Sequence, residues 1–337
     1  MINRRDILHA GLVAASPLSV APLAARAQGQ GQGLVKVRYS EVVRSLFFAP
    51  AYVAISRGFF RDVGLEVELT TANGGDKAMA ALLGGGADIA LMGPEVPIYV
   101  LNSESQRKAR IFCAMTAADG HLLVARDKVE RFDWNALRGK EILGWRPGST
   151  PLIFLETALR QHGLDPRTDV KLVTNIAVPA RVGAWLSGQT QYAIFQEPDA
   201  AQLELDGKAQ VVASIGQTVG MIDYTVFMAT DKFIKENAST VQAWTNAIAK
   251  AMKWTASAPT AELAAALSPF FPGVSAPAMT GGIERYRRLK IWKTSPFIDP
   301  ESIDKFQDIL VQSQLLDTAK RVKFESIVAS EFARKAQ

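Results

Sequence analysis

Two glutamates stand where a strand-like apolar run gives way to a helix. Glu95 follows the run 87–92, and Glu197 follows the run 191–195. A carboxylate in the first turn of a helix occupies the positive end of the helix dipole, where it competes with a small oxyanion. Because a carboxylate accepts hydrogen bonds, these residues favour a ligand with N–H donors, such as an aminopyrimidine or another heteroaromatic solute.

Hydroxyl and aromatic side chains cluster at similar junctions. Hydroxyls and free N–H groups at a helix start can bind ligand atoms, and aromatic rings can stack on a flat solute. Taken singly, each junction is also explained by helix capping, and only their convergence on one cleft favours a site. Arg44, Arg146 and Arg181 can each pair with a ligand acid, so the ligand charge stays open. The expected ligand contacts are Ser40, Ser45, Phe47, Phe48, Glu95, Trp145, Ser149, Thr150, Glu197 and Tyr224.

Residues for catalysis or metal binding are scarce. A single cysteine, Cys113, excludes an intrachain disulfide and a cysteine-based zinc cluster. Of the three histidines, His9 lies in the export segment described below, and the other two cannot form a histidine-rich metal site. Cys113 and His121 both lie in apolar strand-like runs, which indicates a buried structural cysteine rather than a nucleophile. We therefore expect no catalytic residues, no cofactor and no metal.

Residues 1–27 are typical of an export signal. Arg4 and Arg5 precede an apolar run, and 25–27 (Ala-Arg-Ala) place small residues where a signal peptidase cleaves. The paired arginines fit a twin-arginine signal, and an ordinary secretory signal fits as well. The run is too short and proline-broken for a transmembrane helix. We expect cleavage near Ala27, a flexible leader at 28–33 and a periplasmic mature protein.

From residue 34 onward, short strand-like runs alternate with helical segments, which predicts an α/β fold with two lobes. Strand signals stop after 224–229, and the remaining chain has helical periodicity. We expect lobe I to comprise 34–125 and 226–337, and lobe II to comprise 126–225. The chain would cross between lobes near 126 and 223, forming a two-crossover hinge over a ligand cleft, with the helical tail covering lobe I.

Eight segments form an ordered set along the chain. They are PAYVA at 50–54, GFF at 58–60, LEVEL at 65–69, AALLG at 80–84, ADIA at 87–90, DGH at 119–121, LRGK at 137–140 and FQEP at 195–198. This ordered set resembles the nitrate/sulfonate/taurine and thiamine-pyrimidine-precursor group of ABC-transporter periplasmic solute-binding proteins. The resemblance implies a type II periplasmic-binding-protein fold that closes on a small molecule and delivers it to an ABC permease in the inner membrane. We expect a monomer.

The favoured ligand is therefore an N–H-donating heteroaromatic solute, and binding of a sulfonate, nitrate or carboxylate in the same fold is the alternative. An enzyme like the thiamine-pyrimidine synthase of the same family is a further alternative, although its Cys-rich motif has no counterpart here. A ligand-loaded partner of a periplasmic sensor is also open. The isoelectric point near 9.2 does not predict nucleic-acid binding, because Arg4, Arg5, Arg26 and Asp6 contribute +2 of the formal +5.

Overall fold

Two five-stranded sheets form the centre of the computed structural model, which describes residues 33–336. In each sheet one strand runs antiparallel to both of its neighbours, β10 in the first and β5 in the second. We call the elements around each sheet the first and second lobe. The first sheet has the order β2 (Leu65–Thr71), β1 (Val35–Glu41), β3 (Ile89–Met92), β10 (Val226–Thr230), β4 (Ala109–Ala114). The second has the order β7 (Lys171–Val173), β6 (Glu141–Leu143), β8 (Tyr192–Phe195), β5 (Leu122–Ala125), β9 (Gln210–Ser214).

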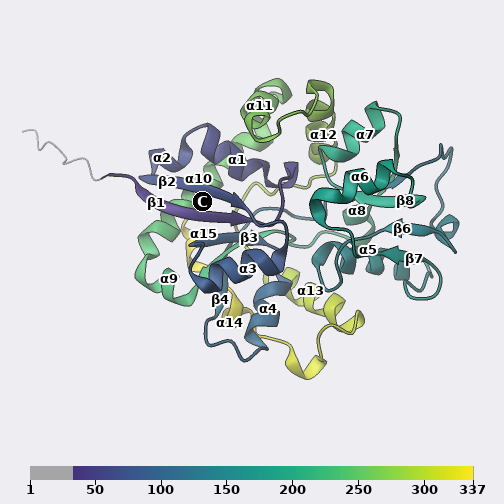
Figure 1. Cartoon of the computed structure of the whole chain (residues 1–337). Helices are drawn as coiled ribbons and strands as arrows, with labels where there is room; N and C mark the ends of the chain where they lie inside the picture. Colours follow the sequence, from purple (N-terminus) through teal and green to yellow (C-terminus); the bar gives the residue numbers. More distant parts are fainter. Residues whose placement is uncertain (1–32, 337) are drawn as a thin grey trace, which may run out of the picture. The chain divides into compact units, whose positions relative to one another are not determined.

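Helices cover both sheets, as Figure 1 shows. The first lobe carries α1 (Ala49–Ser56), α2 (Phe59–Asp62), α3 (Gly75–Gly84), α4 (Glu95–Leu101), α9 (Asp231–Glu236), α10 (Ala238–Ser257), α14 (Phe324–Ile327) and α15 (Glu331–Lys335). The second lobe carries α5 (Thr150–Gln161), α6 (Arg181–Leu186), α7 (Asp199–Leu205) and α8 (Ile215–Val219). Short 3₁₀ turns lie at Leu46–Phe48, Trp134–Leu137, Val178–Ala180, Ser268–Phe270 and Thr318–Lys320.

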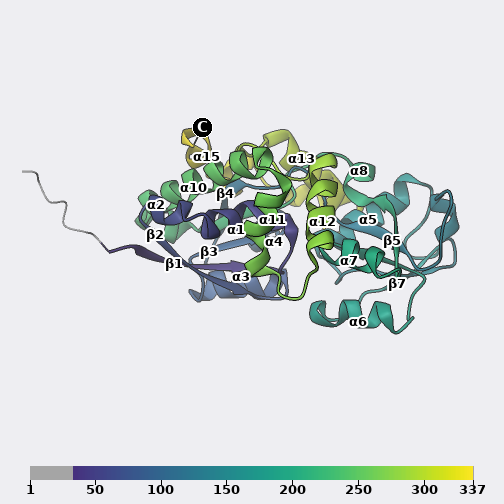
Figure 2. The same ribbon diagram turned by 90° about the horizontal axis from the view of Figure 1, so that it is seen from above.

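The C-terminal helices reach further than the sequence predicts. As expected, α10 covers the first sheet, and Trp244 on its apolar face packs its ring 5.3 Å from that of Tyr39 and 4.4 Å from that of Phe60. However, α12 (Ala276–Arg288) packs against α7, and α13 (Pro300–Gln312) packs against α5. Figure 2 shows both helices beside the second lobe, with α11 (Thr260–Leu267) next to α12. The tail therefore contacts both lobes instead of covering only the first.

One strand lies in a different lobe from the one we expected. The boundary at 125 assigns 122–125 to lobe I, but β5 pairs with β8 and β9 and belongs to the second sheet. The chain therefore leaves the first sheet after β4 and crosses at 115–121, and it returns between α8 and β10. The prediction was wrong because β5 (LLVA) is buried on both faces, so its sequence shows a strand without indicating its partner.

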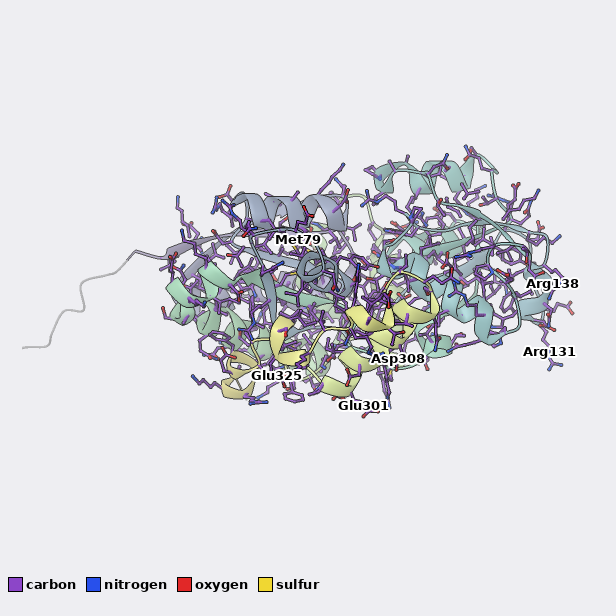
Figure 3. The ribbon with its side chains drawn as sticks, turned by 90° about the horizontal axis from the view of Figure 1, so that it is seen from below. Met79, Arg131, Arg138, Glu301, Asp308 and Glu325 are labelled. Atoms are coloured by element: carbon purple, nitrogen blue, oxygen red, sulfur yellow. The ribbon has the colours of Figure 1, made fainter. Side chains whose placement is uncertain are left out.

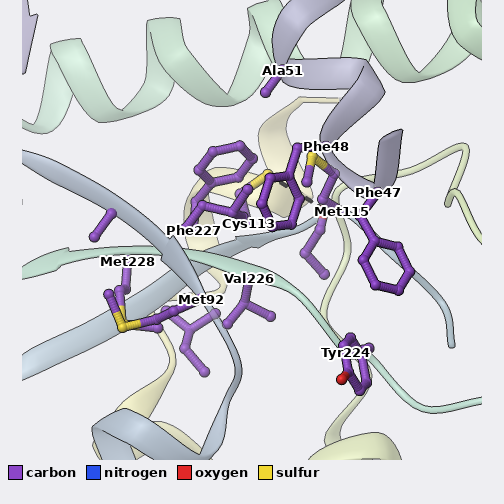
Figure 4. Packing of buried hydrophobic residues seen from close by; sticks show 14 of the residues in the cluster. Phe47, Phe48, Ala51, Met92, Cys113, Met115, Tyr224, Val226, Phe227 and Met228 are labelled. Carbon is purple, nitrogen blue, oxygen red and sulfur yellow. Dashed lines mark hydrogen bonds between the residues drawn. The ribbon is translucent and has the colours of Figure 1, made fainter. Parts of the chain in front are cut away.

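Large apolar side chains fill the space between the first sheet and its helices, as the close view in Figure 4 shows for Phe48, Cys113 and Phe227. The Cys113 side chain is fully buried, and burial raises the pKa of its thiol. This confirms that Cys113 is a structural cysteine in the core. Since the thiolate is the nucleophilic form, a thiol with a raised pKa is unreactive.

Many charged side chains lie on the surface. Arg131 and Arg138 of the second lobe and Glu301, Asp308 and Glu325 of the C-terminal region are all exposed, as Figure 3 shows. Among the described residues, no helix is long and apolar enough to cross a membrane.

Candidate ligand-binding site

A cavity lies where loops of the two lobes meet, beyond the carboxyl ends of strands β1, β3, β6 and β8. Its volume is about 60 Å³, which leaves room for several water molecules. Open α/β sheets bind ligands at this edge because their loops lead into helix N-termini there. The lining residues are Val42, Val43, Phe47, Phe48, Gly74, Gly75, Met92, Gly93, Glu95, His121, Trp145, Ser149, Thr150, Pro151, Val178, Gln196, Tyr224 and Thr225.

Most of the expected contact residues line this cavity, namely Phe47, Phe48, Glu95, Trp145, Ser149, Thr150 and Tyr224. Ser40, Ser45 and Glu197 do not. Ser40 is buried within β1, opposite Thr70 of β2. The Ser45 hydroxyl accepts a hydrogen bond from the Phe47 N–H at 3.2 Å and caps the 3₁₀ turn that follows it.

Glu197 is held away from the cavity by partners of its own. Its carboxylate forms an ion pair with Arg285 of α12 at 2.6 Å and accepts the Ala201 N–H at 2.9 Å. Arg285 also pairs with Glu204 of α7. Glu197 therefore joins α12 to the second lobe. We expected Glu197 to contact the ligand, but the structure places it away from the cavity.

Glu95, Thr150 and Gly93 form a polar corner of the cavity. The Thr150 N–H donates to Glu95 Oε1 at 3.3 Å, whereas Glu95 Oε2 and Thr150 Oγ1 are buried and have no hydrogen-bond partner among the described residues. Burial raises the pKa of Glu95. A Cβ at Gly93 would lie 2.1 Å from both unpartnered oxygens, so only glycine leaves room beside them. The corner therefore presents a carboxylate oxygen and a hydroxyl to a ligand.

A histidine with two polar partners lies behind another wall of the cavity. His121 Nδ1 is 2.5 Å from Asp119 Oδ1, and His121 Nε2 is 2.9 Å from Gln196 Nε2. Neither His121 nor Gln196 is among the ligand contacts that the sequence predicts. The DGH and FQEP segments that carry the family resemblance contain both residues, and this was the signal that could have identified them.

Aromatic rings form the remaining walls. The Trp145 ring meets His121 edge-on at a centroid distance of 5.2 Å, and the Phe47 ring lies 5.7 Å from that of Tyr224. Gly120 permits this packing, since a Cβ there would lie 1.9 Å from the Phe47 ring. Aromatic rings around a small cavity suit a flat solute.

The three arginines that could have paired with a ligand acid are occupied. Arg44 pairs with Glu41 at 2.7 Å. Arg181 lies under the Trp145 ring, 4.1 Å from its centroid, and donates to the carbonyls of Gly144 and Ile194; burial lowers its pKa to about 9. Arg146 forms an ion pair with Asp76. No arginine or lysine lines the cavity within residues 33–336.

The Arg146–Asp76 pair also connects the lobes. Arg146 follows β6 in the second lobe, and Asp76 lies in the first turn of α3 in the first. A second contact crosses nearby, where the Tyr99 hydroxyl donates to the Gly148 carbonyl at 3.4 Å. Together with the Glu95–Thr150 hydrogen bond, these contacts join the two sides of the cavity.

Two mixed sheets, two crossover segments and a cavity at the carboxyl ends of the strands define the type II periplasmic-binding-protein fold, as the sequence predicted. Residues 42–268 match the model of the NMT1-like family, and the chain belongs to that family. This confirms the resemblance to solute-binding proteins of this group.

Comparisons with individual proteins agree. The chain is 37% identical to the putative binding protein YtlA of Bacillus subtilis (strain 168), over 91% of each chain. It is similar to the periplasmic nitrate-binding protein NrtA from Synechocystis PCC 6803, with a TM-score of 0.76, 15% identity and coverage of 90% of this chain and 88% of that one. The fold also occurs in the desulfurization enzyme DSZB, with a TM-score of 0.62, 17% identity and coverage of 90% and 98%.

Proposed function

We propose that this protein is the periplasmic substrate-binding component of an ABC importer and captures a small heteroaromatic solute with N–H donors. One observation carries the choice of ligand. The cavity wall contains a carboxylate with a free oxygen, Glu95 Oε2, and no arginine or lysine among the described residues. Such a wall stabilises an N–H donor of the ligand. Within the described residues it contains no cation that would neutralise an acidic group of the ligand.

An anion in this cavity would meet the Glu95 carboxylate. Two like charges 4 Å apart repel by about 4 kcal/mol at an effective dielectric constant of about 20. The N-terminus of α5, the obvious place for an anion, already donates its Thr150 N–H to Glu95. A planar N–H donor avoids this repulsion, satisfies Glu95 Oε2 and fits between Trp145, Phe47 and Tyr224.

A sulfonate, nitrate or carboxylate is the second candidate. NrtA, which shares the fold, is described as a nitrate-binding protein. Burial raises the pKa of Glu95, which favours the protonated, uncharged form. A protonated Glu95 would leave the start of α5 open to an anion, and this supports the second candidate.

The remaining parts of the proposal follow from the family and the sequence. The predicted export signal at 1–27 and nearly all of the predicted leader lie outside the described residues, so periplasmic location rests on sequence and family. The partners would be the small solute and an inner-membrane permease, and the protein would act as a monomer without catalysis. DSZB shows that the fold also occurs in an enzyme. The experiments must therefore also test whether the solute is chemically changed.

Calorimetry tests the proposal with 4-aminopyrimidine, riboflavin, ethanesulfonate, nitrate and benzoate. We expect 4-aminopyrimidine to bind and the anions not to bind. Glu95→Gln should weaken binding of 4-aminopyrimidine by about 1–3 kcal/mol, because it places an amide donor or a weaker acceptor before the ligand. Glu284→Gln, on an exposed position of α12, is the matched control.

Binding of nitrate or ethanesulfonate but not 4-aminopyrimidine would establish the second candidate instead. Mass spectrometry of the solute after long incubation should recover it unchanged. A new product would contradict the assignment as a binding protein.

A further inference from the structure

The Asp119–His121–Gln196 chain is more deeply buried than a ligand contact requires. Asp119 and His121 are fully buried, and Gln196 is 9% exposed and lines the cavity. Gln196 and His121 line the cavity, whereas Asp119 does not. Asp119 can therefore act on a ligand only through His121, and His121 through its contact with Gln196.

The hydrogen bonds assign the proton on the imidazole. Asp119 Oδ1 accepts the His121 backbone N–H at 2.8 Å, so it is an acceptor, and the Nδ1 atom 2.5 Å away donates to it. The Tyr224 hydroxyl is 3.4 Å from Nδ1, too far to replace the carboxylate. A neutral imidazole with its proton on Nδ1 has an acceptor at Nε2.

The state of His121 then orients the Gln196 amide. An acceptor at Nε2 requires the NH₂ group of Gln196, which agrees with the 2.9 Å contact to Gln196 Nε2. In the described part of the chain, the only hydrogen bond of the Gln196 amide is made by its nitrogen, and Gln196 Oε1 makes none. The carbonyl oxygen is thus left for the ligand, and rotation of the amide would place two acceptors against each other.

Packing keeps the histidine in this orientation. The Phe47 ring lies against it at 5.5 Å and the Trp145 ring at 5.2 Å, both edge-on. The backbone beneath is held equally closely, since a Cβ on Gly216 would lie 2.0 Å from the Asp119 carbonyl oxygen. The ring therefore cannot turn to exchange its two nitrogens without disturbing the cavity wall.

We propose that Asp119 and His121 are positioning residues that hold the Gln196 carbonyl toward the ligand. The site then presents two acceptors, Glu95 Oε2 and Gln196 Oε1, and selects solutes with two N–H donors over isosteres that lack them. This inference rests on the proposed function and specifies its ligand class. A solute without donors leaves these acceptors unpaired, which is why such sites discriminate strongly.

The tautomer is tested without any ligand. Long-range ¹H–¹⁵N correlation spectra of the ¹⁵N-labelled protein at pH 7.5 report which ring nitrogen of His121 carries the proton, and His162→Gln assigns the signals. We expect a proton on Nδ1 and none on Nε2. A proton on Nε2, or on both nitrogens, would overturn the positioning role whatever the protein binds.

Selectivity is tested with 4-aminopyrimidine and 4-methylpyrimidine, which have similar size but differ in N–H donors. We expect the wild type to prefer the amine by at least tenfold. Asp119→Ala removes the acceptor of the Nδ1 proton, so the Nε2 tautomer should become populated, Gln196 should turn, and the preference should fall at least tenfold. An unchanged preference in a variant whose tautomer has reversed would refute the inference.

A second variant covers the case in which Asp119→Ala fails to fold. Gln196→Met keeps the side-chain length and the Nδ1 tautomer but removes one of the two acceptors, so it should reduce the preference at least tenfold. His162→Gln, whose ring stacks on Trp134, should preserve the preference. If neither pyrimidine binds the wild type, the proposed N–H-donor ligand is wrong and selectivity fails with it. The spectra then still decide whether Asp119 and His121 orient Gln196.

Discussion

Glu95 of the first lobe accepts a hydrogen bond at 3.3 Å from the backbone N–H of Thr150, the first residue of α5 in the second lobe. A side chain of the protein thus stands where a bound anion would otherwise complement the helix dipole. The contact also joins the two lobes. Under the proposed function, closure of the cavity and selection against anions would depend on the same carboxylate.

Glu95 makes folding stability depend on pH. Burial raises its pKa above the usual 4.5, so the folded protein holds this proton more tightly than the unfolded chain does. The contribution of Glu95 to stability is then greatest below pH 4.5 and is lost as pH rises through the folded-state pKa. Glu95→Gln should raise the Tm at pH 7.5 by about 2–4 °C per kcal/mol of relieved burial, with a smaller gain at pH 4.

Calorimetric melting of Glu95→Gln and Glu284→Gln at both pH values provides the measurement. Glu284→Gln should match the wild type throughout. A lower Tm for Glu95→Gln at pH 7.5 would show that the carboxylate stabilises the fold.

Gly93→Ala should abolish ligand binding. Its Cβ would lie 2.1 Å from Glu95 Oε2 and Thr150 Oγ1, so it would displace the two groups that a ligand needs. We expect at least a hundredfold loss of affinity for 4-aminopyrimidine by calorimetry. Gly281→Ala in α12, where an added Cβ meets nothing within 4 Å, is the control and should bind normally. Normal binding by Gly93→Ala would place the ligand elsewhere.

The Arg146–Asp76 ion pair should slow ligand release, because it connects the two lobes. Its contribution to folding stability should be small. Both side chains are partly exposed, and pairs of this kind contribute about 0.2–1 kcal/mol. Arg146→Gln should raise the dissociation rate of 4-aminopyrimidine by roughly two- to fivefold in stopped-flow measurements, and added salt should mimic it. Arg138→Gln breaks a pair with Asp169 inside the second lobe and should leave the rate unchanged.

Glu197→Gln should destabilise the protein without changing its ligand. The substitution removes the charge that pairs with Arg285 in a buried site, and we expect a loss of about 1–3 kcal/mol in denaturant unfolding. Affinity of the folded fraction for 4-aminopyrimidine should stay within about twofold, because Glu197 does not line the cavity. A large loss of affinity with normal stability would return Glu197 to the ligand site.

Local patterns predicted nearly all of the elements. The strand-like run at 35–39 is part of β1, the helical run at 150–162 corresponds to α5, and the spacing of Trp244, Ile248 and Met252 marks the buried face of α10. These features depend on residues close in sequence, whose periodicity already reflects which face is buried. The partner of β5 was not predictable in this way, since pairing depends on distant strands.

The environments of Glu95 and Glu197 depend on tertiary contacts that their local sequence does not predict. The sequence by itself determined the α/β lobes, the family and the edge of the sheets where the cavity lies, because strand–helix junctions are local features. Glu95 and Glu197 occupy similar junctions beside a proline, yet Glu95 faces the cavity and Glu197 is paired with Arg285, 88 residues further along the chain. Only the tertiary structure brings that cation to Glu197 and leaves Glu95 Oε2 free. A carboxylate becomes a structural anchor or a ligand acceptor according to its charged neighbours in space, and packing selects those neighbours.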